Sequence, residues 1–170
     1  MGKTFFIIGG ARSGKSAFAL TLADGMEGTK TYIATAQAYD AEMEERIRNH
    51  KDERSEQWHT FEEPLEVAAT IKKAGSGVAL VDCVTLWLTN LMGADLKDSE
   101  IISKAADLSS ACRQSAANIV IVSNEVGQGI VPDNPLARRF RDLSGKVNQL
   151  LAESADEVYF VAAGIPLKMK

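Results

Sequence analysis

The motif best equipped for chemistry lies close to the N-terminus. Its residues are Gly9-Gly10-Ala11-Arg12-Ser13-Gly14-Lys15-Ser16, which fit the pattern G-x-x-x-x-G-K-[ST]. An apolar run precedes the motif and a helical pattern follows it, and in that setting the glycines let backbone N–H groups wrap around a phosphate. The Lys15 ammonium can then reach the β- and γ-phosphates of a nucleotide, and the Ser16 hydroxyl can ligate Mg²⁺. The motif predicts a phosphate-binding loop (P-loop), with Lys15 as a catalytic cation.

A carboxylate that could share the metal closes the apolar run 78–82. Enzymes with a P-loop use a carboxylate at the end of a second strand to hold Mg²⁺, and Asp82 fits that role. Asp is also a favoured N-cap residue, so Asp82 could instead cap the helix expected over 84–91, and the two roles are compatible. Ser16 and Asp82 are the predicted metal ligands.

A histidine within a basic stretch is the third chemical candidate. Residues 38–54 have a helical pattern in which Arg46, His50 and Arg54 are spaced by four and share one face. Two neighbouring guanidinium groups lower the pKa of an imidazole, keep it neutral and nucleophilic, and can hold a triphosphate beside it. A solvated charged helix is the other interpretation. His59 follows in an expected turn, without such neighbours, and is expected to be structural or on the surface.

The elements that position these residues follow from the apolar pattern. Strands are expected over residues 4–8, 30–34, 78–82, 118–123 and 157–162, apolar without clean alternation, as in parallel strands covered on both faces. Helices are expected over residues 15–25, 38–54, 64–73, 84–91, 99–114 and 135–152. The alternation predicts an α/β fold, P-loop NTPase-like, with a doubly wound, mostly parallel sheet flanked by helices, in one catalytic domain over residues 1–170.

The last expected helix has Asn134 as its cap and Pro135 at its first position. Longer loops are expected at 91–98 and 124–134. The second begins where a parallel strand ends, which is where α/β folds bind ligands, and its glycines permit close approach or movement. A plain glycine-rich connector would have the same composition.

Composition argues against several classes of protein. The chain has 170 residues, of which 45% are hydrophobic and 25% charged, as in globular proteins. The net charge of −4 argues against nucleic-acid binding, although residues 1–35 carry four basic side chains against two acidic ones, a field suited to a polyphosphate. Two histidines and two cysteines without ligand spacing argue against zinc, and the cysteines are expected to be reduced core residues. Without a long apolar run no membrane span is expected, and we expect a cytoplasmic protein.

Many segments match one enzyme family. They are residues 9–16, 32–36, 42–54, 58, 82–85, 89–91, 123–132, 136–142 and 145–149. Together they resemble the bifunctional adenosylcobinamide kinase / adenosylcobinamide-phosphate guanylyltransferase family of cobalamin synthesis, from residue 5 to the end. Many families share the P-loop, whereas His50-Lys51-Asp52-x-Arg54 and Asn124-Glu125-Val126-Gly127-x-Gly129 are more particular.

The resemblance implies two reactions. An NTP phosphorylates the aminopropanol hydroxyl of adenosylcobinamide, and GTP then donates GMP to the resulting phosphate, which leaves adenosylcobinamide-GDP and pyrophosphate. In such enzymes a histidine carries GMP as a phosphoramidate, and that histidine matches His50. The resemblance also implies Mg²⁺ as cofactor, GTP and ATP as substrates, and a homotrimer with an active site shared between subunits.

The family's nucleotide contacts match the P-loop residues together with Ala34, Thr35, Ala36, Lys51, Asp52, Glu53, Arg54, Glu62 and Asp82. Glutamate is common in the family at the position of Asp82, whose side chain is one methylene shorter. Two other functions stay open from the residues alone: a plain small-molecule P-loop kinase in which His50 only binds phosphate, and a regulatory nucleotide switch that binds a partner protein. No residue pattern indicates the corrinoid pocket.

Overall fold

A seven-stranded sheet forms the centre of the computed structural model, which describes residues 1–37 and 57–170. Its strands are β1 (Thr4–Gly9), β2 (Lys30–Ala34), β3 (Trp58–Glu62), β4 (Val78–Asp82), β5 (Asn118–Asn124), β6 (Glu157–Ala162) and β7 (Ile165–Lys168). The order is β3-β2-β4-β5-β1-β6-β7, and every neighbouring pair is parallel except β6 with β7.

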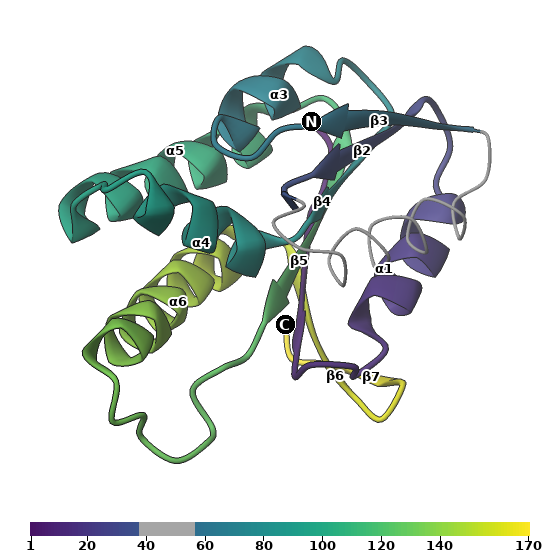
Figure 1. The fold of residues 1–170 in the computed structure, drawn as a ribbon. Helices are drawn as coiled ribbons and strands as arrows, with labels where there is room; N and C mark the ends of the chain where they lie inside the picture. The colour runs from purple at the N-terminus through teal and green to yellow at the C-terminus, as the bar shows by residue number, and fades with distance from the viewer. Residues whose placement is uncertain (38–56) are drawn as a thin grey trace.

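Helices cover both faces of the sheet (Figure 1). They are α1 (Lys15–Asp24), α3 (Val67–Lys73), α4 (Val84–Gly93), α5 (Asp98–Gln114) and α6 (Pro135–Ser154). In β1, Phe5 and Ile7 pack in the cluster that contains α1, whereas Phe6 and Ile8 pack in the cluster that contains α4, α5 and α6. Because both faces are buried, the strand is apolar at every position, and the predicted doubly wound, mostly parallel architecture is confirmed.

The five predicted strands are confirmed to within one residue, but one helix begins later than expected. The helix predicted over 64–73 starts at Val67. Glu63 is the reason: its carboxylate accepts the N–H groups of Leu65 (3.0 Å) and Glu66 (2.8 Å), which holds these residues in a turn ahead of the helix.

The loop predicted over 91–98 is wrong for half of its length. Helix α4 runs on to Gly93 and α5 begins at Asp98, so only residues 94–97 connect them. The start of α6 is as predicted, because the Asn134 side chain accepts the N–H groups of Leu136 and Ala137 and Pro135 occupies the first turn.

Two strands escaped the sequence analysis, one at each edge of the sheet. β3 is exposed after Trp58, so it lacks an apolar run, and His59 lies in this strand rather than in a turn. β7 is exposed throughout and contains Pro166, which a sheet tolerates at an edge because proline donates no ladder hydrogen bond.

The remaining predictions concern helices and cysteines. The helix predicted over 38–54 lies outside the described residues. Within residues 1–37 and 57–170, no helix is long and apolar enough to cross a membrane. Cys83 and Cys112 are both free and buried, as predicted, and burial is the main cause that raises the pKa of the Cys112 thiol to about 12.

Candidate functional site

The P-loop connects β1 to α1, and Lys15 is the first residue of the helix. The Lys15 side chain is buried and folds back over the loop, where its Nζ donates a hydrogen bond to the Gly10 carbonyl at 3.1 Å. Gly14 has a φ of 91°, a left-handed conformation that glycine adopts without steric cost. A phosphate in this loop would meet the amino terminus of α1 and the Lys15 ammonium together.

The turn between β6 and β7 packs directly against the P-loop. The Gly164 N–H donates to the Ser13 carbonyl at 2.8 Å, and a Cβ added to Gly14 would lie 3.0 Å from the Gly164 Cα. A Cβ on Gly9 would lie 2.3 Å from the Val161 carbonyl oxygen. The first and last parts of the chain therefore form the P-loop's surroundings together, and these close approaches need glycine in the loop.

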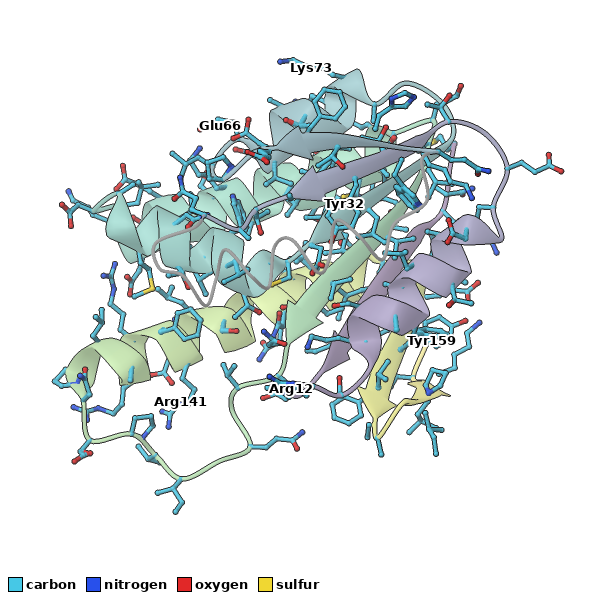
Figure 2. All side chains as sticks on the ribbon, turned by 45° about the vertical axis from the view of Figure 1, so that its right-hand side comes forward. Arg12, Tyr32, Glu66, Lys73, Arg141 and Tyr159 are labelled. Carbon is cyan, nitrogen blue, oxygen red and sulfur yellow. The ribbon has the colours of Figure 1, made fainter. Side chains whose placement is uncertain are left out.

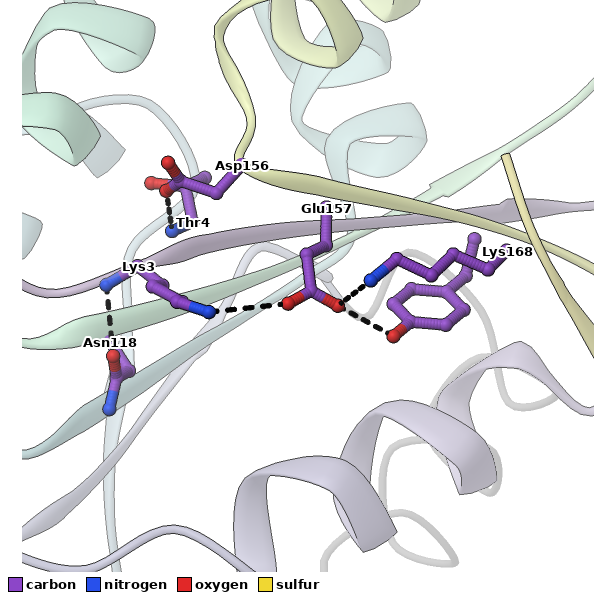
Figure 3. Close-up of polar contacts among 7 residues, drawn as sticks. Lys3, Thr4, Asn118, Asp156, Glu157 and Lys168 are labelled. Carbon is purple, nitrogen blue, oxygen red and sulfur yellow. Dashed lines mark hydrogen bonds and ion pairs between the residues drawn. The ribbon is translucent and has the colours of Figure 1, made fainter. Parts of the chain in front are cut away.

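Hydrogen bonds to the Glu157 carboxylate link β6, β7 and the residue that precedes β1 (Figure 3). The Glu157 carboxylate accepts from the Lys168 Nζ at 2.8 Å, the Tyr159 hydroxyl at 2.7 Å and the Lys3 Nζ at 3.5 Å. The hydrogen bond from Lys168, and then the one from Tyr159, lower the Glu157 pKa from 4.5 to about 2. These contacts join β7 to β6 and to the residue that precedes β1.

The predicted metal ligand Asp82 ends β4 on the other side of the P-loop strand. β5 lies between β4 and β1, with Asp82 in register with Val122 and Gly9 in register with Asn124. The Tyr32 hydroxyl donates to the Asp82 Oδ2 at 2.6 Å, which fixes the carboxylate. The N-cap of α4 is Cys83 rather than Asp82, so the proposed capping role of Asp82 is wrong.

The charges of Asp82 and Lys15 both act on the Cys83 thiol. Burial, and then the Asp82 charge, raise its pKa to about 11, against the opposing effect of the Lys15 charge. Both charged groups therefore lie near the same buried point at the carboxyl edge of the sheet. A cation that follows β1 and a carboxylate that ends β4 are the kinds of group that phosphoryl transfer uses.

A hydrogen-bond network holds the backbone that follows β2. The Thr35 hydroxyl donates to the Cys83 carbonyl at 2.8 Å and accepts from the Cys83 N–H at 2.9 Å. The Asn90 side chain donates to the Thr35 carbonyl at 2.8 Å and to the Pro64 carbonyl at 3.1 Å. Ala34 is in register with both Glu62 and Asp82, so the ends of β2, β3 and β4 lie side by side.

The loop after β5 closes the site on the P-loop side. The Glu125 N–H donates to the Gly9 carbonyl at 3.0 Å, and the Asn124 N–H donates to the Thr85 hydroxyl at 2.8 Å. A pocket of about 500 Å³ lies here; its lining comprises Gly10, Ala11, Arg12, Ser13, Glu125, Val126, Gln128, Gly129, Phe160, Val161, Ala162 and Ala163. Figure 2 shows Arg12 beside the chain that leaves β5.

The structure places one part of the predicted site at one edge of the sheet, whereas the other part lies outside the described residues. The P-loop, Ala34, Thr35, Ala36, Glu62 and Asp82 all lie along the carboxyl edge of the sheet. His50, Lys51, Asp52, Glu53 and Arg54 lie outside the described residues. Sequence analysis assigned no role to Tyr32, Asn90 or Gly164, each of which has a partner 50 or more residues away in the chain.

Solved structures show the same fold at low sequence identity. An ATPase from the type III secretion system of pathogenic bacteria aligns with a TM-score of 0.62 at 10% identity, over 99% of this chain and 57% of that chain. The P4 protein from bacteriophage phi6, in complex with ADP, aligns with a TM-score of 0.54 at 18% identity, over 96% of this chain and 52% of that chain. The fold is that of the P-loop NTPases.

Close relatives match along nearly the whole chain. The bifunctional adenosylcobalamin biosynthesis protein CobU of Salmonella typhimurium is 43% identical over 178 residues, covering 96% of this chain and 98% of that protein. The protein CobP of Pseudomonas aeruginosa, with the same description, is 44% identical over 166 residues, covering 96% and 95%. The sequence profile of one family matches residues 5–169. The chain belongs to the cobinamide kinase / cobinamide phosphate guanyltransferase family.

Proposed function

We propose that this chain phosphorylates adenosylcobinamide with ATP or GTP and then transfers GMP from GTP to the phosphate, giving adenosylcobinamide-GDP and pyrophosphate. The observation that carries the proposal is the Lys15 ammonium folded over the P-loop, with the Asp82 carboxylate across β5 at the same edge of the sheet. Membership of the family and the bifunctional relatives support both steps.

The donors around the P-loop fit Mg²⁺. The Ser16 hydroxyl and the Asp82 carboxylate are hard oxygen ligands, and the Tyr32 hydroxyl orients the carboxylate. We assign both side chains to the metal, which supplies charge neutralisation for the phosphates when bound. The short Asp82 side chain reaches the metal directly or through a water molecule.

In the kinase step, the P-loop amides and Lys15 bind the β- and γ-phosphates, and Lys15 neutralises charge that develops on the bridging oxygen. The acceptor hydroxyl attacks the γ-phosphorus, the bond to the β-phosphate oxygen breaks, and the nucleoside diphosphate leaves. Ala34, Thr35, Ala36 and Glu62 contact the nucleotide along the adjacent strand ends.

In the transfer step, neutral His50 attacks the α-phosphorus of GTP, and pyrophosphate leaves from the P-loop. Lys51, Asp52, Glu53 and Arg54 contact the same GTP. The phosphate of adenosylcobinamide phosphate then attacks the phosphoramidate, which releases His50. Each displacement is in line because the incoming group attacks phosphorus opposite the leaving group: His50 opposite pyrophosphate, and then the acceptor phosphate opposite His50.

Residues 1–170 act as one catalytic domain in a cytoplasmic homotrimer, with the active site shared between subunits. Light scattering on the purified chain measures this assembly. A mass of three chains supports the trimer, whereas a monomer that retains both activities contradicts the shared site.

One incubation tests the two reactions. Adenosylcobinamide is incubated with the enzyme, GTP and Mg²⁺, and the corrinoid products are weighed by mass spectrometry. The added mass of phosphate and then of GMP is expected. Phosphate addition alone would favour a plain small-molecule kinase, and an unchanged corrinoid would favour a regulatory switch.

A labelling experiment tests the histidine. With α-labelled GTP, the wild-type protein is expected to carry an acid-labile, alkali-stable label that His50→Ala loses, while His50→Ala keeps its kinase activity. His59→Ala is the matched control, because His59 is exposed in β3, and it should label like the wild type. Guanylylation that persists in His50→Ala would contradict the assignment.

A further inference from the structure

The pocket beside the P-loop shares residues 10–13 with the nucleotide site, but its other lining residues have no role in the nucleotide contacts assigned above. It is lined by residues 10–13 of the P-loop, the loop after β5, and the end of β6 with the residue that follows it. The sheet order puts the ends of β3, β2 and β4, with Glu62, Ala34 and Asp82, beyond β5, whereas this pocket lies at the P-loop, with lining from both neighbours of β1. A reaction between two substrates needs space for the second one next to the transferred phosphate, and the pocket provides it.

Glu125 brings a carboxylate to this pocket. It is the only acidic residue among the described residues that line the pocket, and its side chain is partly exposed there. Its backbone N–H is bonded to the Gly9 carbonyl at 3.0 Å, which ties the residue to the first glycine of the P-loop. One carboxylate oxygen, Oε1, accepts the Gly127 N–H, which holds the side chain in place.

The backbone that carries Glu125 is anchored to helices on one face of the sheet. The Asn124 N–H donates to the Thr85 hydroxyl of α4 at 2.8 Å, and the Asn148 side chain of α6 donates to the Asn124 carbonyl at 3.2 Å. Asn148 in turn accepts the Ser123 hydroxyl at 2.7 Å, in the buried interior. Because two packed helices hold this strand end, the position of the backbone that carries the carboxylate is set by the scaffold.

The kinase step calls for a group of this kind. An alcohol must lose its proton as it attacks phosphorus, and a carboxylate placed next to the phosphate commonly accepts that proton. The acceptor of the second step is a phosphate, already ionised near neutral pH, so its attack needs no base. The two reactions therefore differ in their need for a proton acceptor, although they share the P-loop.

We propose that this pocket binds the alcohol acceptor of the kinase step and that Glu125 accepts the proton of its attacking hydroxyl. The acceptor oxygen forms a bond to the γ-phosphorus, the bond from that phosphorus to the β-phosphate oxygen breaks, the proton passes to the Glu125 carboxylate, and the nucleoside diphosphate leaves. The inference rests on the proposed kinase function. Arg12 and Gln128 provide polar contacts for the acceptor, and Val126 and Phe160 provide apolar ones.

Glu125→Gln separates a proton acceptor from a residue that only shapes the loop. The amide keeps the size of the side chain and an oxygen for the Gly127 N–H, but it loses the basic oxygen. The full-length variant is assayed for phosphorylation of adenosylcobinamide and, separately, for GMP transfer to adenosylcobinamide phosphate made beforehand. Asp133→Asn is the matched control, because Asp133 is an exposed acid of the same loop and does not line the pocket.

We expect the kinase kcat of Glu125→Gln to fall by about 100-fold or more, with GMP transfer and labelling of the protein within about twofold of wild type. Asp133→Asn should leave both reactions unchanged. A kinase kcat for Glu125→Gln within about threefold of an active wild type would overturn the inference alone, and so would an equal loss of both reactions, which indicates a structural role. A wild-type protein that phosphorylates no acceptor would instead overturn the proposed function, and this inference with it.

Discussion

On the β4 side of the P-loop, side chains make the hydrogen bonds: Tyr32 donates to the Asp82 carboxylate, Thr35 to the Cys83 carbonyl and Asn90 to the Thr35 carbonyl. On the β6 side, the contacts to the P-loop come from backbone N–H groups, and an open pocket separates the loop after β5 from the end of β6. The β4 side holds functional groups in fixed positions, whereas the β6 side fixes the shape of the P-loop and leaves an open pocket beside it. In the proposed function, the side with the hydrogen-bonded side chains holds the metal and the nucleotide, and the pocket holds the reaction partner.

Substitutions on the β4 side and on the β6 side should therefore have different effects. On the β4 side, removal of a single side-chain atom should disturb metal and nucleotide binding, because the network depends on those atoms. On the β6 side, backbone conformation is what matters, so substitutions that strain a turn should have more effect than substitutions that delete a polar group.

Lys15 serves both proposed reactions, so its removal should have the largest effect on activity. Lys15→Ala removes the ammonium that folds over the P-loop, so we expect both kcat/KM values to fall by about 1,000-fold or more. The two reactions are assayed separately, with circular dichroism as the control for folding. If either reaction kept more than a tenth of its wild-type rate, the P-loop lysine would not serve both steps.

Tyr32→Phe probes the side-chain network alone. It removes the hydroxyl that donates to Asp82 at 2.6 Å and keeps the ring, so we expect about tenfold more Mg²⁺ to be needed for half-maximal activity. Tyr159→Phe is the matched control, because its hydroxyl is bonded to Glu157 at the far edge and should not affect the Mg²⁺ titration. Identical titrations for Tyr32→Phe and wild type would remove Asp82 from the metal site.

Gly164→Ala probes the backbone contacts on the other side. Gly164 has a φ of 78°, which costs an alanine about 1 kcal/mol, so the turn should shift and weaken the bond from its N–H to the Ser13 carbonyl. We expect KM for the nucleotide to rise about three- to tenfold in both reactions, with a smaller change in kcat.

Gly145→Ala is the matched control for that substitution. Gly145 lies within α6, and a Cβ there would meet open space, so this variant should keep the wild-type KM and unfold at a slightly higher temperature. Unchanged KM values in Gly164→Ala would show that the hairpin does not shape the P-loop.

The smallest effect is expected for a substitution of Glu157, which links the β6–β7 hairpin to the residue that precedes β1. Hydrogen bonds from Lys168 and Tyr159 lower the Glu157 pKa from 4.5 to about 2, so its stabilising contribution is complete above pH 4.5 and disappears as the pH falls toward 2. Glu157→Gln should lose about 1 kcal/mol of stability at neutral pH and show a weaker pH dependence over that interval.

Urea unfolding at several pH values measures this contribution. Glu153→Gln, an exposed substitution near the end of α6, is the control and should follow the wild-type curve. Parallel curves for Glu157→Gln and wild type between pH 4.5 and 2 would contradict the role given to the carboxylate.

Local patterns in the sequence predicted much of this fold. The buried strands are apolar at successive positions, and Asn134 and Pro135 mark the start of α6, so neighbouring residues carry the information. β3 and β7 were missed because edge strands need no continuous apolar run and one of them contains Pro166. The helix predicted around His50 stays a prediction.

The site was predictable where a motif is contiguous. The P-loop and the position of Asp82 follow from short patterns, whereas Tyr32, Asn90 and Gly164 each have a partner 50 or more residues away. No spacing rule within one element encodes such contacts, because the packing of the whole sheet creates them. Glu125 was visible as part of a particular segment, but its place beside the P-loop depends on the pairing of β5 with β1.

The bond between Gly164 and Ser13 also sets an order of events during synthesis. The ribosome makes residues 9–16 well before residues 163 and 164, the turn that packs against them. A nascent chain that lacks β6 and β7 has the nucleotide motif without the contacts that shape it, and such distant contacts form late. Nucleotide binding would then report that translation has passed the β6–β7 hairpin.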